Sequence, residues 1–236
     1  MTSRTGRPRT RGLRTAAVTF VGAIVVSGCT FHPGQAAVVN GSNISQGTVD
    51  DLVHAGCSFF EAQRKQTGGA APATSTAYLR HLFTQNLISF KIIDKAASEL
   101  HLSVSPAVIA KATSGQTLPA SLNSKDRDLL KEFFADSARQ SVQEATIGAH
   151  LKNPSVTNAD HVTPATIPAS QAYLRVFTAK QHVAVNPAYG TWHFGHLLDT
   201  DGSLSGAQSS VARRWLALRA TNGQSVDGLP PSQVCG

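Results

Sequence analysis

Between Leu79 and Leu100 the apolar residues recur at every third or fourth position, which is the spacing of one face of an α-helix. The members of this stripe are Leu79, Phe83, Leu87, Phe90, Ile93, Ala97 and Leu100. A helix of this kind is stable in water only when its apolar face packs against other elements. The stripe therefore predicts a long helix inside a packed helical domain.

Four further segments carry helical signals. The first runs from Ser45 or Thr48 to about Gln66, with Asp50 and Asp51 in its first turn, and its buried face carries Val49, Val53, Cys57 and Phe60. The second is short and runs from Ser105-Pro106 to about Thr113. The third is long, is capped by Ser124 and ends near Leu151, and the fourth covers residues 170–179. Serine before a helix caps its free N–H groups, and proline is tolerated at the first helical position. Residues 153–168 contain three prolines and are expected to form a linker.

Short strands are expected on both sides of this helical stretch. Residues 36–40 form a short apolar run that ends in the turn signal Asn40-Gly41, and Ile44 lies on a possible returning strand. Residues 182–185 form an extended run after the last of these helices. The sequence thus predicts a mainly α fold of about four to six helices with a small β element.

The first 28 residues have the pattern of a targeting segment. Five arginines precede an apolar run over residues 16–26, and they are Arg4, Arg7, Arg9, Arg11 and Arg14. The run is shorter than the roughly 20 apolar residues that a transmembrane helix needs. We therefore expect a signal peptide over residues 1–28.

The sequence Val26-Ser27-Gly28-Cys29 at the end of this segment resembles the lipobox of bacterial lipoproteins, in which the cysteine receives a diacylglycerol group before cleavage. The resemblance implies lipidation of Cys29, a lipidated tether over residues 29–35, and a location on the extracytoplasmic face of the cell membrane. The alternative is an ordinary thiol beside a signal-cleavage site of the alanine type.

The remaining two cysteines are Cys57 and Cys235. In an oxidising compartment we expect them to form a disulfide. Spacing in the sequence does not bring their Cα atoms within bridging distance, so two free thiols remain the alternative.

The charge of the chain belongs largely to the expected leader. The whole chain has 21 Lys and Arg against 14 Asp and Glu, and five of the arginines precede residue 16. The mature chain would be nearly neutral, without a basic patch interleaved with aromatic residues. We therefore expect no nucleic-acid partner.

Two segments carry a resemblance to a known family. Residues 37–41, with Ile44-Ser45 and Asp51-Leu52 after them, resemble the start of the SurA N-terminal domain, a helical chaperone module that SurA shares with PrsA and trigger factor. Residues 183–192 resemble the segment that closes this module in SurA-like lipoproteins. The residues that carry the likeness are Val39, Asn40, Gly41, Asn186, Pro187, Tyr189, Gly190 and Trp192. Ser42, Ala188 and His193 depart from the pattern of the family.

The resemblance implies a SurA N-terminal-like domain over residues 36–195, in which the first strand and the closing segment lie together. A C-terminal tail over residues 196–236 would follow, with a possible helix at 207–218. SurA and PrsA usually carry a parvulin prolyl-isomerase domain before the closing segment, and residues 152–169 leave no room for one. We therefore expect no prolyl-isomerase activity and no enzyme.

Other chemistry finds little support in the motifs. His193 and His196 are spaced as His-x-x-His but lack a regularly spaced third ligand, so we expect no metal site. Residues 199–203 are similar to part of a calcium loop, yet Leu197 and Gln208 stand where carboxylates are needed, and a turn is the preferred interpretation. The sequence contains no nucleophile elbow, phosphate loop or dinucleotide motif, and no cofactor is expected.

The phenylalanines of the predicted helices are expected to be core residues, although some of them would suit a binding groove. They are Phe59, Phe60, Phe83, Phe90, Phe133 and Phe134. Our first hypothesis is a membrane-anchored, extracytoplasmic, non-catalytic chaperone or peptide-binding module, in which the face between the long helices meets unfolded or partly folded exported proteins. The second is an accessory lipoprotein that binds one specific folded partner in the envelope.

Overall fold

The computed structural model describes residues 33–159, 164–198, 226 and 228–236. All of them belong to one compact unit, Phe31–Gly236. The expected signal peptide, Cys29, the loop at 199–203 and the possible helix at 207–218 lie outside the described residues.

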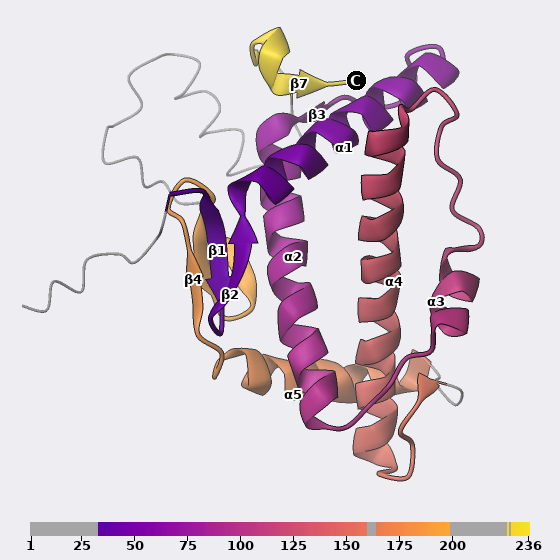
Figure 1. Cartoon of the computed structure of the whole chain (residues 1–236), viewed down its shortest axis with the longest axis vertical. Helices are drawn as coiled ribbons and strands as arrows, with labels where there is room; N and C mark the ends of the chain where they lie inside the picture. Colours follow the sequence, from indigo (N-terminus) through magenta and orange to yellow (C-terminus); the bar gives the residue numbers. More distant parts are fainter. Residues whose placement is uncertain (1–32, 160–163, 199–225, 227) are drawn as a thin grey trace, which may run out of the picture. The chain divides into compact units, whose positions relative to one another are not determined.

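The described part of the chain is mainly helical, as the sequence predicts (Figure 1). Its α-helices are α1 (Gln46–Gln66), α2 (Thr76–Glu99), α3 (Pro106–Thr113), α4 (Ser124–Lys152) and α5 (Ile167–Thr178). Figure 1 shows α2 and α4 side by side, with α1 across one end of the pair and α5 across the other. The short helix α3 packs beside α4.

Local caps fix where these helices begin. Ser45 Oγ accepts a hydrogen bond from Thr48 N at 2.9 Å, and α1 starts at Gln46. Its first turn therefore contains no acidic residue, which corrects the expectation that Asp50 and Asp51 lie there. Asn123, one residue before the predicted Ser124, caps α4 by accepting from Asp126 N at 2.8 Å. The predicted linker also contains the start of α5, because Pro168 is tolerated in a first turn.

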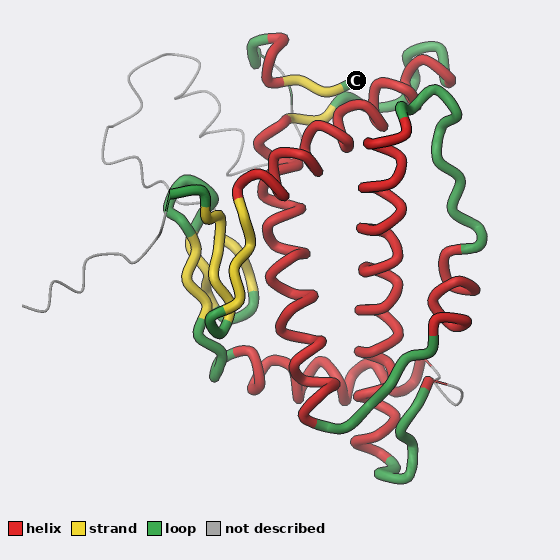
Figure 2. The backbone as a smooth tube through the Cα atoms, in the orientation of Figure 1, coloured by secondary structure: helices red, strands yellow, loops and turns green. Residues whose placement is uncertain are grey.

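A three-stranded sheet joins the two ends of the helical stretch (Figure 2). The strand β1 (Gln35–Val39) lies between β2 (Ser42–Ser45) and β4 (Val183–Val185), and both pairings are antiparallel. Asn40 and Gly41 both have positive φ, 49° and 83°, as a two-residue type I′ turn requires. The expected β element, with the N-terminal strand against the later extended run, is confirmed.

Two smaller pairings extend beyond what the sequence predicts. β5 (Thr191–His193) and β6 (His196–Leu198) form a hairpin, and β3 (Thr74–Ser75) pairs with β7 (Val234–Cys235). The expected boundary between residues 195 and 196 thus falls inside the turn of a hairpin. The last residues of the chain also pair with the helical domain, so residues 234 and 235 belong to that domain rather than to a separate tail.

The core lies between the sheet and helices α1, α2 and α4. Its most deeply buried large side chains include Val39, Val49, Leu79, Ile88 and Ile147. The phenylalanines of α2 and α4 contact one another, with ring centroids 4.9 Å apart for Phe83 and Phe133 and 5.6 Å apart for Phe90 and Phe133. The space between the long helices is therefore filled by packed aromatic rings at this level.

The expected partners Cys57 and Cys235 lie at disulfide distance, with their Cα atoms 4.7 Å apart. Cys57 is on α1 and Cys235 is in β7, so the link joins segments separated by 178 positions in the sequence. Nearby, Arg64 Nη1 donates to the carbonyl oxygen of Gly236 at 3.3 Å. The C-terminal strand is thus held against α1 by the cysteine pair and by the side chain of Arg64, and its main chain pairs with β3.

Candidate functional site: a pocket beside the β5–β6 hairpin

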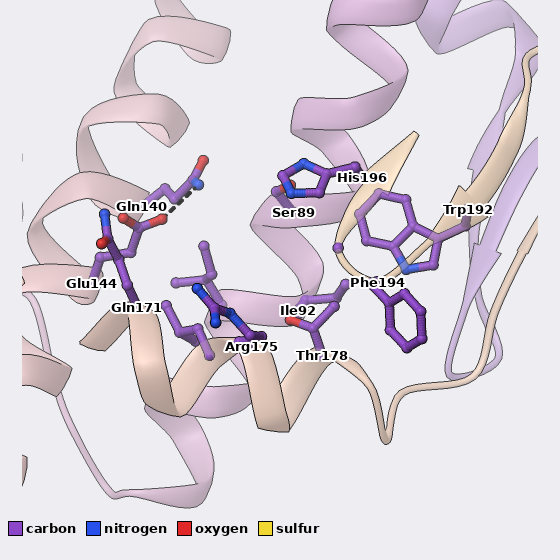
Figure 3. Close-up of a pocket in the computed structure, with 13 residues that line it drawn as sticks. Ser89, Ile92, Gln140, Glu144, Gln171, Arg175, Thr178, Trp192, Phe194 and His196 are labelled. Carbon is purple, nitrogen blue, oxygen red and sulfur yellow. Dashed lines mark hydrogen bonds between the residues drawn. The ribbon is translucent and has the colours of Figure 1, made fainter. Parts of the chain in front are cut away.

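A pocket of about 380 Å³ lies where α2, α4 and α5 meet the β5–β6 hairpin (Figure 3). Ser89, Ile92 and Ile93 come from α2, and Gln140 and Glu144 come from α4. The α5 residues are Gln171, Leu174, Arg175 and Thr178, and the hairpin supplies Trp192, Phe194, Gly195 and His196. Four elements that are distant in the sequence therefore build one cavity with both apolar and polar walls.

The apolar part of the pocket continues the core. Ile92 and Ile93 are only 2% and 6% exposed, so they form a rigid wall at the end of α2. Leu174 and Trp192 are half-buried and pack against the same core cluster. Because these side chains are already fixed by packing, this wall loses little conformational freedom when a ligand contacts it.

The polar part of the pocket comes mainly from α4 and α5. Gln140 Nε2 donates to Glu144 Oε1 at 2.9 Å, within one turn of α4. Gln171 and Arg175 are four residues apart on α5 and are exposed. Neither side chain has a hydrogen-bond partner within the described part of the chain. Their donors and acceptors are therefore free for a ligand.

Gln85 of α2 holds the hairpin in place. Its Nε2 donates to the carbonyl oxygen of Gly195 at 3.1 Å, and its Oε1 accepts from Leu197 N. Leu197 is 4% exposed and inserts its side chain toward the core, whereas its neighbour Leu198 is 48% exposed. The hairpin is thus attached to α2 by one amide side chain and one buried leucine.

The tip of the hairpin exposes an aromatic residue in an unfavourable backbone conformation. Phe194 and Gly195 are the two central residues of the turn, with φ of 45° and 90°. Phe194 is 70% exposed and stands edge-on to His193, with ring centroids 4.2 Å apart. Positive φ is uncommon for a bulky residue and costs free energy.

Gly190 allows the chain to fold back onto the hairpin. Its φ is +130°, and a Cβ atom there would lie 2.6 Å from the carbonyl oxygen of Leu198. Any other residue would therefore push β6 away. This contact gives a physical reason for the glycine in the segment Tyr189-Gly190-Thr191-Trp192.

Trp192 carries an unused hydrogen-bond donor at the pocket. Its Nε1 is buried and has no acceptor. An unpaired buried donor costs about 1–3 kcal/mol relative to a satisfied one. The donor lies on a wall of the pocket, where a ligand oxygen would be its nearest new partner.

The motif residues Asn40 and Asn186 form side-chain hydrogen bonds at the edges of the β1–β4 pairing. Asn40 Nδ2 donates to Gln181 Oε1 at 2.9 Å, and Asn40 Oδ1 accepts from His182 N at 3.0 Å. Asn186 Nδ2 donates to the Gln35 carbonyl at 3.1 Å. Asn186 therefore ties the closing segment to the first strand, and Asn40 ties the first turn to the two residues directly before β4.

The other motif residues complete this junction. Val39 is 2% exposed in β1, Gly41 completes the first turn, and Pro187 follows Asn186 directly. Burial, and after it the negative charge of Asp50, raise the pKa of the Tyr189 hydroxyl. Of the motif residues, only Trp192 also lines the pocket.

The two histidines of the hairpin occupy paired positions on β5 and β6. His193 pairs with His196 across the turn, and both are exposed. Within residues 33–159, 164–198, 226 and 228–236, no three His, Cys, Asp or Glu side chains are grouped as a metal site would require. Only His196 lines the pocket.

A second polar cluster surrounds Asp126 at the start of α4. Asp126 is 2% exposed, and its carboxylate accepts from Asn123 Nδ2 at 2.8 Å and lies 3.2 Å from His54 Nδ1. Ser58 also donates to it. Ser58 and His54 each form a hydrogen bond with Asp126. Within the described residues, no hydrogen bond joins Ser58 to His54. The cluster is a buried helix cap that joins α4 to α1, without the relay of a nucleophilic triad.

The sequence singled out Trp192 as a motif residue and His196 as a rejected metal ligand, and it predicted no pocket. Gln140, Gln171 and Arg175 carry no motif, and only the packing of α4 against α5 brings them together. Gln85 lies on the polar face of α2. The apolar stripe predicts this helix without giving Gln85 any role. The Phe194-Gly195 turn lacks the asparagine or aspartate that marks such turns.

In the described part of the chain, no helix is long and apolar enough to cross a membrane. Comparison of the chain with models of protein families, with curated proteins and with solved structures finds no match to any of them.

Proposed function

We propose that the chain is a lipid-anchored extracytoplasmic lipoprotein whose helical domain, related to the SurA N-terminal module, binds segments of unfolded or partly folded exported proteins without catalysis. The observation that carries the proposal is the pocket beside the β5–β6 hairpin. It combines a packed apolar wall, unpaired polar side chains and an exposed phenylalanine at one rim. A polypeptide segment offers both apolar side chains and main-chain amides to such a surface.

The N-terminal sequence supports the location. Five arginines, a short apolar run and Ser27-Gly28-Cys29 follow one another in the order of a lipoprotein signal. Two acyl chains on Cys29 would give stable membrane attachment, where one gives only marginal binding. The disulfide distance between Cys57 and Cys235 fits an oxidising compartment.

The location has a direct test with a matched control. In the host, a Cys29→Ser variant should lose its retention in the membrane fraction, because no sulfur remains for lipid attachment. A Cys57→Ser variant keeps that sulfur and should stay in the membrane fraction. Retention of the Cys29→Ser variant would contradict lipid anchoring.

The binding function is tested by suppression of aggregation. The chain from Thr30 onward contains every described element, and it should protect several chemically unfolded exported proteins at near-stoichiometric amounts. Protection should persist at high salt, because apolar contact is not screened. An inert protein of similar size is the control.

Two experimental outcomes would contradict the proposed chaperone function. Absence of protection for every client tested would contradict chaperone action. A single folded envelope protein recovered with the lipoprotein in a one-to-one ratio would instead favour an accessory lipoprotein with one dedicated partner.

A further inference from the structure

We infer that the pocket beside the β5–β6 hairpin binds an extended peptide segment through its main-chain amides, with one large apolar side chain of the segment placed against Phe194. This inference rests on the proposed function and names the part of the client that the chain recognises.

The polar groups of the pocket match a peptide main chain. Gln140, Gln171 and Ser89 each offer both a donor and an acceptor. A peptide presents one N–H and one C=O group at almost every residue, whatever its sequence. Side chains of this dual type therefore suit a ligand whose sequence varies, whereas a pocket for one small molecule uses a fixed set of donors and acceptors.

Charge gives the pocket no preference for an ionic ligand. Glu144 of α4 and Arg175 of α5 carry opposite charges, and His196 is the remaining titratable side chain of the lining. A phosphate or carboxylate ligand calls for several converging cationic groups, and only one arginine is present. A neutral amide backbone meets no electrostatic penalty here.

Two type I′ turns in the described part of the chain show that Phe194 is costly at its position. The β1–β2 turn uses Asn40-Gly41, the pair that this conformation favours. The β5–β6 turn adopts the same signs of φ with phenylalanine in the first position. A strained aromatic residue that is 70% exposed contributes little to folding, and its position at the rim of the pocket gives it a binding role.

The buried Nε1 of Trp192 adds a second observation that points to a ligand. It is a donor without an acceptor on the wall formed by the hairpin. Gln85 bonds this hairpin to α2, and Trp192 lies in strand β5 of the same hairpin with its Nε1 donor unpaired. A peptide carbonyl that enters at this wall would accept its hydrogen bond.

Trp192 also serves as the reporter in the experiment. The chain has two tryptophans, and a Trp215→Phe background leaves Trp192 as the one tryptophan, which is excited selectively beyond the absorption of tyrosine. The probe is a blocked heptapeptide of serine and glycine with one central phenylalanine, titrated into the millimolar range. Calorimetry gives a second readout. The same peptide with N-methylated amides beside the phenylalanine removes the main-chain donors.

The variants separate the pocket from the rest of the hairpin. Phe194→Asn removes the ring but restores the favoured Asn-Gly turn, so the hairpin stays folded. Leu198→Asn removes the other exposed apolar side chain of the hairpin, which lies outside the pocket lining. We expect Phe194→Asn to weaken peptide binding by about ten-fold or more, because an aromatic side chain that becomes buried on binding carries much of the binding energy, and Leu198→Asn to change it by less than about two-fold.

The binding results test two statements, that the main chain of the peptide is recognised and that this pocket binds it. Equal binding of the N-methylated peptide would overturn main-chain recognition, and unchanged binding by Phe194→Asn would overturn the assignment to this pocket. If the chain suppresses aggregation but does not bind the heptapeptide, the inference falls and the proposed function stands. If neither activity is found, both fall.

Discussion

At the scale of single residues, Asp126 is the buried charge whose environment is best defined. Burial on its own would raise the pKa of this carboxyl, but hydrogen bonds from Ser58, His54 and Asn123 outweigh burial and lower its pKa below the usual 3.8. A carboxyl with a lowered pKa in the folded chain stabilises the fold at pH values above its unfolded pKa. That stabilisation is lost as the pH falls through the lower, folded pKa.

Asp126→Asn should therefore destabilise the chain by about 1–3 kcal/mol at neutral pH, because the new amide cannot accept all the bonds that the carboxylate accepts. Denaturant unfolding should show the difference in unfolding free energy between wild type and variant shrinking as the pH falls below 3.8, the usual pKa of this carboxyl. Asp128→Asn is the control, since Asp128 is exposed on the same helix. A difference that is independent of pH would contradict the account.

The role of Gln85 could not be predicted from the sequence, because its hydrogen-bond partners in the hairpin are main-chain atoms 110 and 112 positions away. Asn40 and Gly41, by contrast, were recognisable because a two-residue turn is encoded locally. Residues that act through neighbouring positions are thus predictable here. Residues that act through distant main-chain atoms depend on the finished packing.

Gln85→Ala should release the hairpin from α2. We expect a loss of about 1–2 kcal/mol in unfolding free energy, the contribution of hydrogen bonds that are removed from a half-buried site. The amide of Leu197 should exchange with deuterium faster. Gln143→Ala, which removes an exposed bond to Asp94, should leave that amide unchanged. Unaltered exchange at Leu197 in the Gln85 variant would show that the hairpin is held by other contacts.

At the scale of elements, the helices were predictable and the smallest strands were not. Helices α2 and α3 agree closely with their predicted ranges, because apolar spacing, Ser105 and Pro106 are local signals. The strands β3 and β7 are two residues long and carry no periodicity. Their pairing depends on tertiary packing, which brings Cys235 close to α1.

Gly148 shows how one residue sets the approach of two elements. A Cβ atom at this position of α4 would lie 2.1 Å from the carbonyl oxygen of Thr166, directly before α5. The glycine therefore allows α5 to lie close against α4, and α4 and α5 form two sides of the pocket. The α4 residues that line this cavity are Gln140 and Glu144, one to two turns before it.

Gly148→Ala should destabilise the chain by about 1–3 kcal/mol through steric overlap, although alanine is the better helix former. Thermal or denaturant unfolding measures the loss. Gly47→Ala in α1 is the matched control, because its nearest neighbour would be Ser45 Oγ at 3.8 Å, an ordinary contact. Equal effects of the two substitutions would contradict the close contact at Thr166.

At the scale of the whole molecule, the fold closes by joining its ends. The strand β4 returns to β1 before the hairpin, and β7 returns to β3 at the end of the chain. The first return agrees with the sequence prediction, and the second extends the domain beyond residue 195. The fold class was thus predictable from the sequence, whereas the pocket, which depends on α5 and the hairpin, was not.

The cysteine pair should add stability to this closure. In the chain-entropy picture, a link between residues 178 apart contributes up to about 5 kcal/mol by restricting the unfolded chain. A Cys57→Ser, Cys235→Ser double variant should lose that amount in denaturant unfolding. Intact mass without reductant should show the wild type lighter by two hydrogens than the reduced chain. Equal masses would mean that the thiols are free.

Peptide binding at the hairpin is tested in the host by photo-cross-linking from position 194 of the lipid-anchored chain. A photoreactive residue there should form adducts with many different exported proteins, and the same residue at position 198 should form few. This result would place client binding at the rim of the pocket. A single adduct of constant mass, or equal yields from both positions, would contradict a general peptide-binding role for this site.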